Sequence, residues 1–303
     1  MTTPPTGATI EVAGLTKQFA SVLAVDDLSF TVGPGRVTGF LGPNGAGKTT
    51  TLRCLLGLVA PTSGRATIDG QDYHDVPHPM RIVGSALEAT GFHPGRNAIN
   101  HLRVLARAAG VDEKRAEEVL DLVGLHDSAK RSVGGFSLGM RQRLQLAAAL
   151  LGDPGVLVLD EPANGLDPEG IAWLRSFLRY LAGQGRTVLV SSHVLSEVEQ
   201  TVDDVVIIAR GRLVRACTLD QLTADHRHVV VRTPTPQQLC DALAAHAPAA
   251  TVTAEDGALH VVDSDAAVIG RIAFEARVEL HELRPAASDL EQVFLSLTGG
   301  ATS

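Results

Sequence analysis

The residues from Gly42 to Thr49 have the types and spacing of a phosphate-binding loop. They fit the pattern G-x-x-x-x-G-K-[ST] and read Gly42, Pro43, Asn44, Gly45, Ala46, Gly47, Lys48 and Thr49. Glycines let such a loop curl so that several backbone N–H groups point at one phosphate chain, and the dipole of the following helix adds positive potential. We predict that this loop, together with Thr50, binds the phosphates of ATP. Lys48 would bridge the β- and γ-phosphates, and Thr49 would hold Mg²⁺.

Two adjacent carboxylates follow an apolar run later in the chain. The run 156–159 reads as a buried strand, and Asp160 and Glu161 come directly after it. We predict that Asp160 orients Mg²⁺ and that Glu161 positions or deprotonates the water that attacks the γ-phosphate, a role worth roughly 100- to 10,000-fold in rate. By themselves, two acids after a strand are more often a solvated turn. The phosphate loop is what favours the catalytic interpretation.

A histidine stands in a comparable place. His193 follows another expected strand, 187–190, by three residues, and it could donate a hydrogen bond to the γ-phosphate. A lone histidine at a strand end is more often a surface or capping residue. Its predicted role therefore depends on the other residues of the proposed site.

The elements that would position these groups belong to an α/β fold. From Ile10 to Gly211, short β-branched runs alternate with helical stretches, which is typical of a mostly parallel sheet with crossover helices. Such sheets bind ligands at the carboxyl ends of their strands, where the predicted groups stand. Residues 86–153 are largely helical in character and predict an inserted helical lobe.

The sequence changes character after about Leu222, so we predict two domains, 1–222 and 223–303. The second would be a small α+β unit with a hairpin turn at Asp256 and Gly257. Its other expected elements are a strand at 228–232, a helix at 237–246, a helix at 266–274, a strand at 278–282 and a last helix at 289–297.

Composition limits the possible partners and compartments. The formal net charge of −8 argues against a broad nucleic-acid footprint. The three cysteines lack the spacing of a zinc site or of a disulfide framework and are expected to be reduced, as in a cytoplasm. The N-terminus lacks the features of a signal peptide, and the longest apolar run, around 146–151, is far shorter than the roughly 18 residues that cross a bilayer. Any transport function would require a separate membrane partner.

One further segment carries a family resemblance. The run Phe136 to Arg143 reads Phe-Ser-Leu-Gly-Met-Arg-Gln-Arg just ahead of the acidic strand, and with the preceding motifs it makes residues 10–222 resemble the ABC ATPases. The resemblance implies a P-loop NTPase fold with an antiparallel N-terminal β-subdomain. It implies that Ser137 and Gly139 act on the γ-phosphate held by a second copy, that Phe19 stacks on adenine, and that 164–167 is the D-loop.

The resemblance also implies a mode of action. Two copies would sandwich two ATP molecules, and hydrolysis would reopen the dimer and drive a separate transmembrane permease. The chain would then be cytoplasmic and peripheral on the inner face of the cell membrane. Within the family it looks most like the ATPases of bacitracin- and daunorubicin-resistance exporters, because of the Phe136–Arg143 run, a Glu at the Q-loop and the C-terminal run 290–295.

Three positions depart from the family pattern. Glu88 stands where the family carries its Q-loop glutamine; a carboxylate can still ligate Mg²⁺, but it adds negative charge and cannot donate a hydrogen bond. Leu138 replaces the first glycine of the LSGGQ pair and Met140 replaces its glutamine. Backbone approach to the phosphate across the dimer would therefore rest on Gly139.

Two other functions compete with transport. An ABC ATPase that acts on DNA would place a long coiled coil between Lys48 and Ser137, which are only 137 − 48 = 89 residues apart here, and one that acts on ribosomes would carry two cassettes. A nucleotide-binding regulator without hydrolysis is disfavoured by Glu161 and His193, although Glu88 keeps it open.

Overall fold

The computed structural model describes residues 6–87, 91–194, 199–224, 228–255 and 257–286. The contacts divide them into two compact units, which meet in sequence between Leu219 and Asp220. The boundary expected from the sequence, near residue 223, falls inside the short helix α8 (Leu219–Ala224). Within the described ranges, no helix combines the length and apolar character needed to span a membrane.

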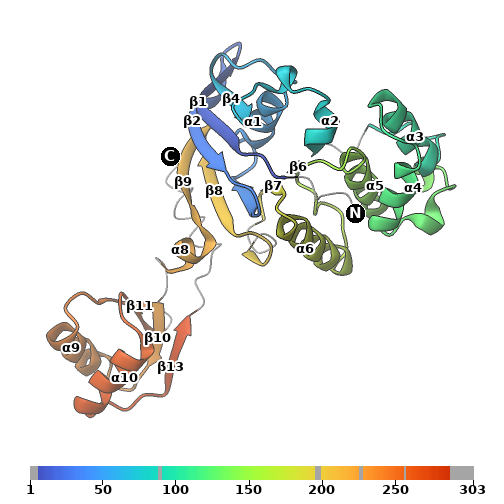
Figure 1. Ribbon diagram of the computed structural model, residues 1–303. Coiled ribbons are helices and arrows are strands. Elements are labelled where there is room, and N and C mark those ends of the chain that lie inside the picture. Colours follow the sequence, from blue (N-terminus) through green and yellow to red (C-terminus); the bar gives the residue numbers. More distant parts are fainter. Residues whose placement is uncertain (1–5, 88–90, 195–198, 225–227, 256, 287–303) are drawn as a thin grey trace. The chain divides into compact units, whose positions relative to one another are not determined.

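A six-stranded, mostly parallel sheet forms the centre of the first unit (Figure 1). Its strands, in spatial order, are β5 (Val83–Ala86), β6 (Val156–Asp160), β7 (Thr187–Ser192), β3 (Val37–Leu41), β8 (Asp204–Ala209) and β9 (Arg212–Thr218). Only β9 runs antiparallel to its neighbour. All residues of β3 and β7 are buried, as expected of strands covered on both faces.

A three-stranded antiparallel sheet packs beside it, in the order β2 (Val22–Val32), β1 (Ile10–Phe19) and β4 (Ser63–Ile68). Inward-facing residues of β1 such as Ile10, Val12 and Leu15 are buried in a core that the two sheets share. The ring centres of Phe30 on β2 and Phe40 on β3 lie 5.2 Å apart in that core. The expected N-terminal β-subdomain is therefore present.

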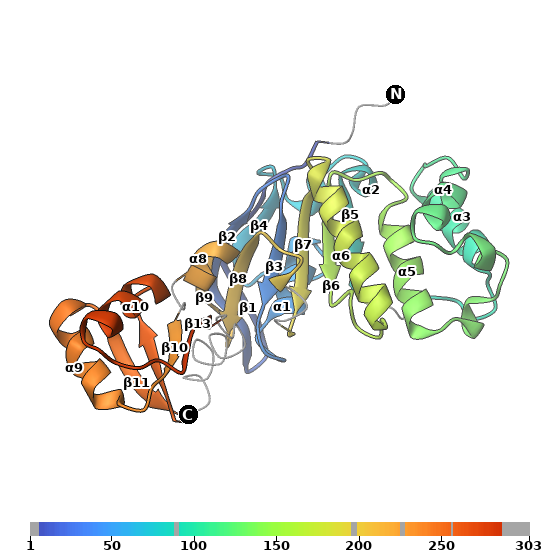
Figure 2. The same ribbon diagram turned by 90° about the horizontal axis from the view of Figure 1, so that it is seen from below.

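The helices of the first unit fall into two groups. Helix α1 (Lys48–Leu55) contacts strands of both sheets, and α6 (Pro168–Gly183) packs on β3 and β7 (Figure 2). The inserted lobe consists of α3 (Ala98–Ala108), α4 (Arg115–Leu122) and α5 (Leu138–Ala149), with the short 3₁₀ turns His126–Ser128 and Val133–Gly135. The remaining short elements are the 3₁₀ turn Tyr73–Asp75 and α2 (Pro79–Ile82).

The second unit is a βαββαβ arrangement with a four-stranded antiparallel sheet. Its elements are β10 (His228–Arg232), α9 (Pro236–His246), β11 (Thr251–Glu255), β12 (Ala258–Val262), α10 (Ala266–Glu275) and β13 (Glu282–Ala286). The strand order β11-β12-β10-β13 is that of a ferredoxin-like sheet. Leu239 of α9 and Ile269 of α10 share a core with alternate residues of β10 and β12, so both helices cover the same face.

One expected strand of this unit was wrong. The sequence predicted a strand at 278–282, but β13 begins at Glu282 and extends to Ala286. Val278 is a buried core residue outside the strand, and pairing with β10 begins at Arg232 opposite Glu282. Pro285 argues against a central strand in the sequence, yet β13 is an edge strand, where a missing N–H is tolerated. The helix expected at 289–297 lies outside the described residues.

Candidate functional site

The phosphate loop joins the end of β3 to the start of α1. Gly45 and Gly47 have φ values of 80° and 103°, in the left-handed region that glycine adopts most easily. A Cβ at Gly47 would lie 2.5 Å from the carbonyl oxygen of Ala24, so no larger residue fits there without a shift of backbone. The loop is closed by a hydrogen bond of 3.1 Å from the N–H of Ala46 to the carbonyl of Pro43. These constraints explain the glycine spacing of the motif.

Lys48 is held inside this loop. Its side chain is only 7% exposed, and its ammonium donates to the carbonyl oxygen of Gly42 at 2.7 Å. The same nitrogen lies 3.5 Å from Oε1 of Glu161. A buried cation is costly without partners, and the loop supplies carbonyl oxygens that a phosphate could replace.

The carboxylate of Asp160 links three elements. Its Oδ2 accepts a hydrogen bond of 2.7 Å from the hydroxyl of Thr49, at the start of α1. Its Oδ1 accepts a hydrogen bond from the hydroxyl of Ser191 on β7. The sequence-predicted pair of Thr49 and Asp160 is thus brought together, although the two residues are far apart in sequence.

Glu161 has an unusual backbone conformation. Its φ is +49°, which costs an L-amino acid on the order of 1 to 2 kcal/mol. Strain of this kind concentrates where the surrounding structure fixes a functional group. Nδ1 of His193 lies 2.8 Å from Oε2 of Glu161, and because an ionised carboxylate only accepts hydrogen bonds, His193 must donate through Nδ1. The second carboxylate therefore stands between Lys48 and His193.

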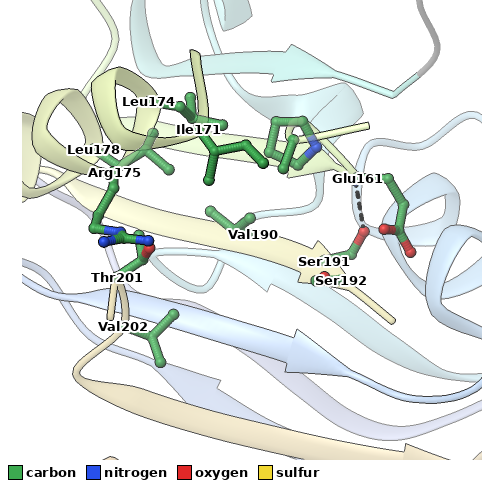
Figure 3. Close-up of a pocket in the computed structure, with 12 residues that line it drawn as sticks. Glu161, Ile171, Leu174, Arg175, Leu178, Val190, Ser191, Ser192, Thr201 and Val202 are labelled. Atoms are coloured by element: carbon green, nitrogen blue, oxygen red, sulfur yellow. Dashed lines mark hydrogen bonds between the residues drawn. The ribbon is translucent and has the colours of Figure 1, made fainter. Parts of the chain in front are cut away.

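Ser191 is a residue that the sequence did not single out. Its hydroxyl also accepts a hydrogen bond of 3.0 Å from the backbone N–H of Glu161, which Figure 3 shows as a dashed line. The only signal that the sequence offers is a pair of hydroxyl residues at the end of this strand. The other residues of the strand are apolar, except for the first. That signal does not reveal which residue on the neighbouring strand they face.

Ser137 and Gly139 lie in a different group, at the start of α5. The hydroxyl of Ser137 caps this helix by accepting a hydrogen bond of 3.2 Å from the N–H of Met140. An added Cβ at Gly139 would meet Leu166 at 3.2 Å, and Gln142 donates to the carbonyl of Asn164 at 3.2 Å. The start of α5 and the predicted D-loop thus form one open groove, lined also by Leu138.

The remaining predicted residues have less distinctive surroundings. Phe19, at the end of β1, is 45% exposed, and the ammonium of Lys17 lies 4.8 Å from the centre of its ring. Thr50 is partly exposed on the first turn of α1, while Pro43 and Asn44 are exposed in the loop. Glu88 lies outside the described residues.

Cys54, Cys217 and Cys240 are free, as expected, and burial raises the pKa of the Cys54 thiol.

The oxygen atoms at the loop suit Mg²⁺. Magnesium is usually held by one or two carboxylates together with hydroxyl oxygens, waters and the phosphates of a nucleotide, rather than by a cage of protein ligands. Thr49 and Asp160 present a hydroxyl and a carboxylate in direct contact. Among the described residues there is no cluster of three or more His, Cys, Asp or Glu side chains that could hold a metal alone. The site therefore fits a metal that arrives with phosphates.

Comparison with known proteins supplies independent information. A family model described as "ABC transporter" matches residues 25–164, and one described as a domain of unknown function matches 227–291. A bacitracin transport ATP-binding protein of Bacillus licheniformis is 46% identical over 221 residues, 72% of each chain. One of Enterococcus faecalis is 35% identical over 297 residues, 96% of each chain. A solved ATP-binding subunit of an ABC transporter matches with a TM-score of 0.64 and 30% identity, over 70% of this chain and 91% of that one.

Proposed function

The chain belongs to the ATP-binding subunits of the ABC transporter family, and from this premise we propose that it hydrolyses ATP to power export of a hydrophobic drug or antibiotic-like compound. The predicted fold class and family are confirmed by these comparisons. The observation that carries the catalytic part of the proposal is the position of Glu161, held between Lys48 and His193 at the end of β6.

The proposed residue roles follow from the contacts. Lys48 exchanges the carbonyl of Gly42 for the phosphates of ATP, and the loop amides surround them. Thr49 and Asp160 hold Mg²⁺, which neutralises charge on the phosphates, and Glu88 is a further candidate ligand. Glu161 accepts a proton from the attacking water, and His193 orients that carboxylate through Nδ1; in the imidazolium form, its Nε2–H would also donate to the γ-phosphate. Phe19 offers an exposed ring for adenine.

The proposal includes a second copy of the chain. Ser137 and Gly139 stand at the N-terminal end of α5, a twelve-residue helix whose first backbone N–H groups can bind an anion. The structure groups these residues with the D-loop rather than with the phosphate loop, which supports their action on ATP held by a second copy. Two ATP molecules would then join two copies, and loss of the γ-phosphate would release them.

The export partner is a separate membrane protein. No helix in the described part of the chain could cross a membrane, and ABC subunits of this kind pair with a transmembrane permease. We place the chain on the inner face of the cell membrane, bound to that permease. The bacitracin transport ATP-binding protein of Enterococcus faecalis matches the chain over 96% of its length, including the second unit, which favours export over action on DNA or ribosomes.

The variant Glu161→Gln tests this function. The amide keeps the size of the side chain but cannot take the proton, so we expect turnover to fall at least about tenfold while ATP binding is kept and the closed dimer accumulates. Turnover is measured by phosphate release, ATP affinity by calorimetry and dimer formation by size-exclusion chromatography with ATP.

A matched control is Glu275→Gln, on the exposed surface of α10 in the second unit. It removes the same charge far along the chain from the site and should leave turnover unchanged. Equal turnover in Glu161→Gln and the unaltered chain would refute the assignment of Glu161 as the base.

A further inference from the structure

Ser191 is completely buried at the end of β7, where it lies directly opposite Asp160 of β6. The three strand residues before it, Val188 to Val190, are aliphatic. Burying a hydroxyl costs free energy unless the hydroxyl is hydrogen-bonded, so its partners indicate what it does.

The single hydroxyl of Ser191 contacts both acidic residues of the site. A serine hydroxyl has one hydrogen to donate and two lone pairs that accept. It donates to Oδ1 of Asp160. It also accepts from the backbone N–H of Glu161 at 3.0 Å, the bond that Figure 3 shows as a dashed line. It is thus a bridge between a side chain and the backbone of the next residue.

This bridge fixes the carboxylate of Asp160. One oxygen of that carboxylate is held by Ser191 and the other by the hydroxyl of Thr49. Rotation of the carboxylate would break at least one of these bonds. If the oxygen of Thr49 turns to Mg²⁺, Ser191 still holds the carboxylate in place.

The same bridge fixes the turn that presents Glu161. Its N–H points to the hydroxyl of Ser191 and also to the Ser191 carbonyl, at 3.3 Å. A φ of +49° lies in the left-handed region, which L-amino acids rarely adopt, so the backbone at Glu161 does not favour this turn by itself. The hydrogen bonds across the two strands therefore keep the Glu161 carboxylate directed toward His193.

We propose that Ser191 is a positioning residue for ATP hydrolysis: its hydroxyl fixes Asp160 for the Mg²⁺ of the nucleotide and Glu161 for the attacking water. This inference rests on the proposed function and adds to it a residue that acts through the two carboxylates without touching the nucleotide.

The test compares Ser191→Ala and Ser191→Cys with the control Thr38→Val. Thr38 is a buried residue of β3 in the same sheet, and its hydroxyl has no hydrogen-bond partner in the part of the chain that the structure describes. The control therefore removes a buried hydroxyl without removing a contact to the site. Ser191→Cys keeps the space filled but replaces a good donor with a weak one.

The main readout involves no turnover. Calorimetry gives the Kd of a non-hydrolysable ATP analogue with and without Mg²⁺, and the ratio measures how much the metal improves binding. For Ser191→Ala we expect this improvement to shrink by about tenfold, and the rate of phosphate release to fall by a similar factor, because a hydrogen bond to a charged group is lost. Ser191→Cys should lie between Ser191→Ala and the unaltered chain, and Thr38→Val should change neither quantity.

The outcomes separate the possible roles of the hydroxyl. A lower midpoint of thermal unfolding with an unchanged Mg²⁺ effect would make Ser191 a merely structural residue and overturn the proposal. If Ser191→Ala does not fold, an unchanged Mg²⁺ effect in Ser191→Cys overturns it equally. If the proposed function is wrong, Glu161→Gln turns over ATP at the normal rate. That result leaves the calorimetric comparison of the Ser191 variants with the unaltered chain interpretable.

Discussion

The two units treat polar side chains in opposite ways. At the carboxyl ends of the parallel strands, Lys48 and Ser191 are buried, and they donate hydrogen bonds to carbonyl and carboxylate oxygens. In the second unit, the core between sheet and helices is aliphatic, and the charged network of Glu282 with Arg232 and Arg284 lies at the surface. Buried polar groups reduce stability unless they are paired, so the set of them in the interior of the first unit indicates a functional site.

The two units also differ in what they need to fold. Both units hold non-glycine residues in a left-handed conformation, Glu161 in the first and Asp263 and Arg277 in the second. The described core of the second unit is aliphatic, whereas the first must also keep a lysine out of water. Variants in the two units should therefore affect different measurements, stability for one and nucleotide binding for the other.

The largest expected effect is on the stability of the second unit. Leu239 on α9 is fully buried, and Leu239→Ala should lower the free energy of unfolding of this unit by about 2 to 5 kcal/mol through lost burial and a cavity. Hydrogen exchange of the β10 and β12 amides measures the change. Val268→Ala, at an exposed position on α10, is the control. A parallel loss of ATP affinity in Leu239→Ala would show that the two units do not respond separately.

The next effect is on nucleotide binding in the first unit. Lys48→Ala should weaken ATP binding roughly 10- to 100-fold, since a charge-assisted hydrogen bond contributes about 1.5 to 3 kcal/mol. Calorimetry with ATP gives the affinity. Lys114→Ala removes an exposed lysine of the helical lobe and should bind ATP normally. Full affinity in Lys48→Ala would count against the phosphate-loop assignment.

The smallest effect concerns the surface charges of the second unit. A hydrogen bond from Arg284 and the charges of Arg284 and Arg232 lower the pKa of Glu282. Because the folded-state pKa is lowered, the stabilisation is complete above the ordinary pKa of glutamate and is lost as the pH falls through the folded-state value. Arg284→Ala should raise the pKa of Glu282 toward its ordinary value, as measured by NMR titration of the carboxyl carbon.

The effect of Arg284→Ala on unfolding should be much smaller than that of Leu239→Ala, because solvent and salt screen an exposed pair. Arg271→Ala, another exposed arginine of the same unit, should leave the pKa of Glu282 unchanged. If Arg284→Ala destabilised the unit as much as the core variant, the contrast between aliphatic core and solvated charges would be wrong.

Features that depend only on neighbouring residues could be predicted from the sequence. The spacing of Gly42, Gly47 and Lys48 sets a loop between a strand and a helix, and the run 156–159 sets a strand that ends at two carboxylates. These predictions needed only local backbone preferences and the alternation of apolar and polar residues. The same reasoning was wrong for β13, because its position depends on pairing with β10 and on its place at the sheet edge.

Which groups meet depends on the packing of segments that are far apart in the sequence. Strand register places Ser191 opposite Asp160, and packing of another segment sets the carbonyl of Ala24 against Gly47. The strand sequences specify that β6 and β7 are buried, but not which strand residues face each other, because side chains of similar size and polarity allow several registers. Contacts between distant segments arise from the pairing of whole strands, so the positions of the acidic residues could be predicted from the sequence while the hydroxyl that holds them could not.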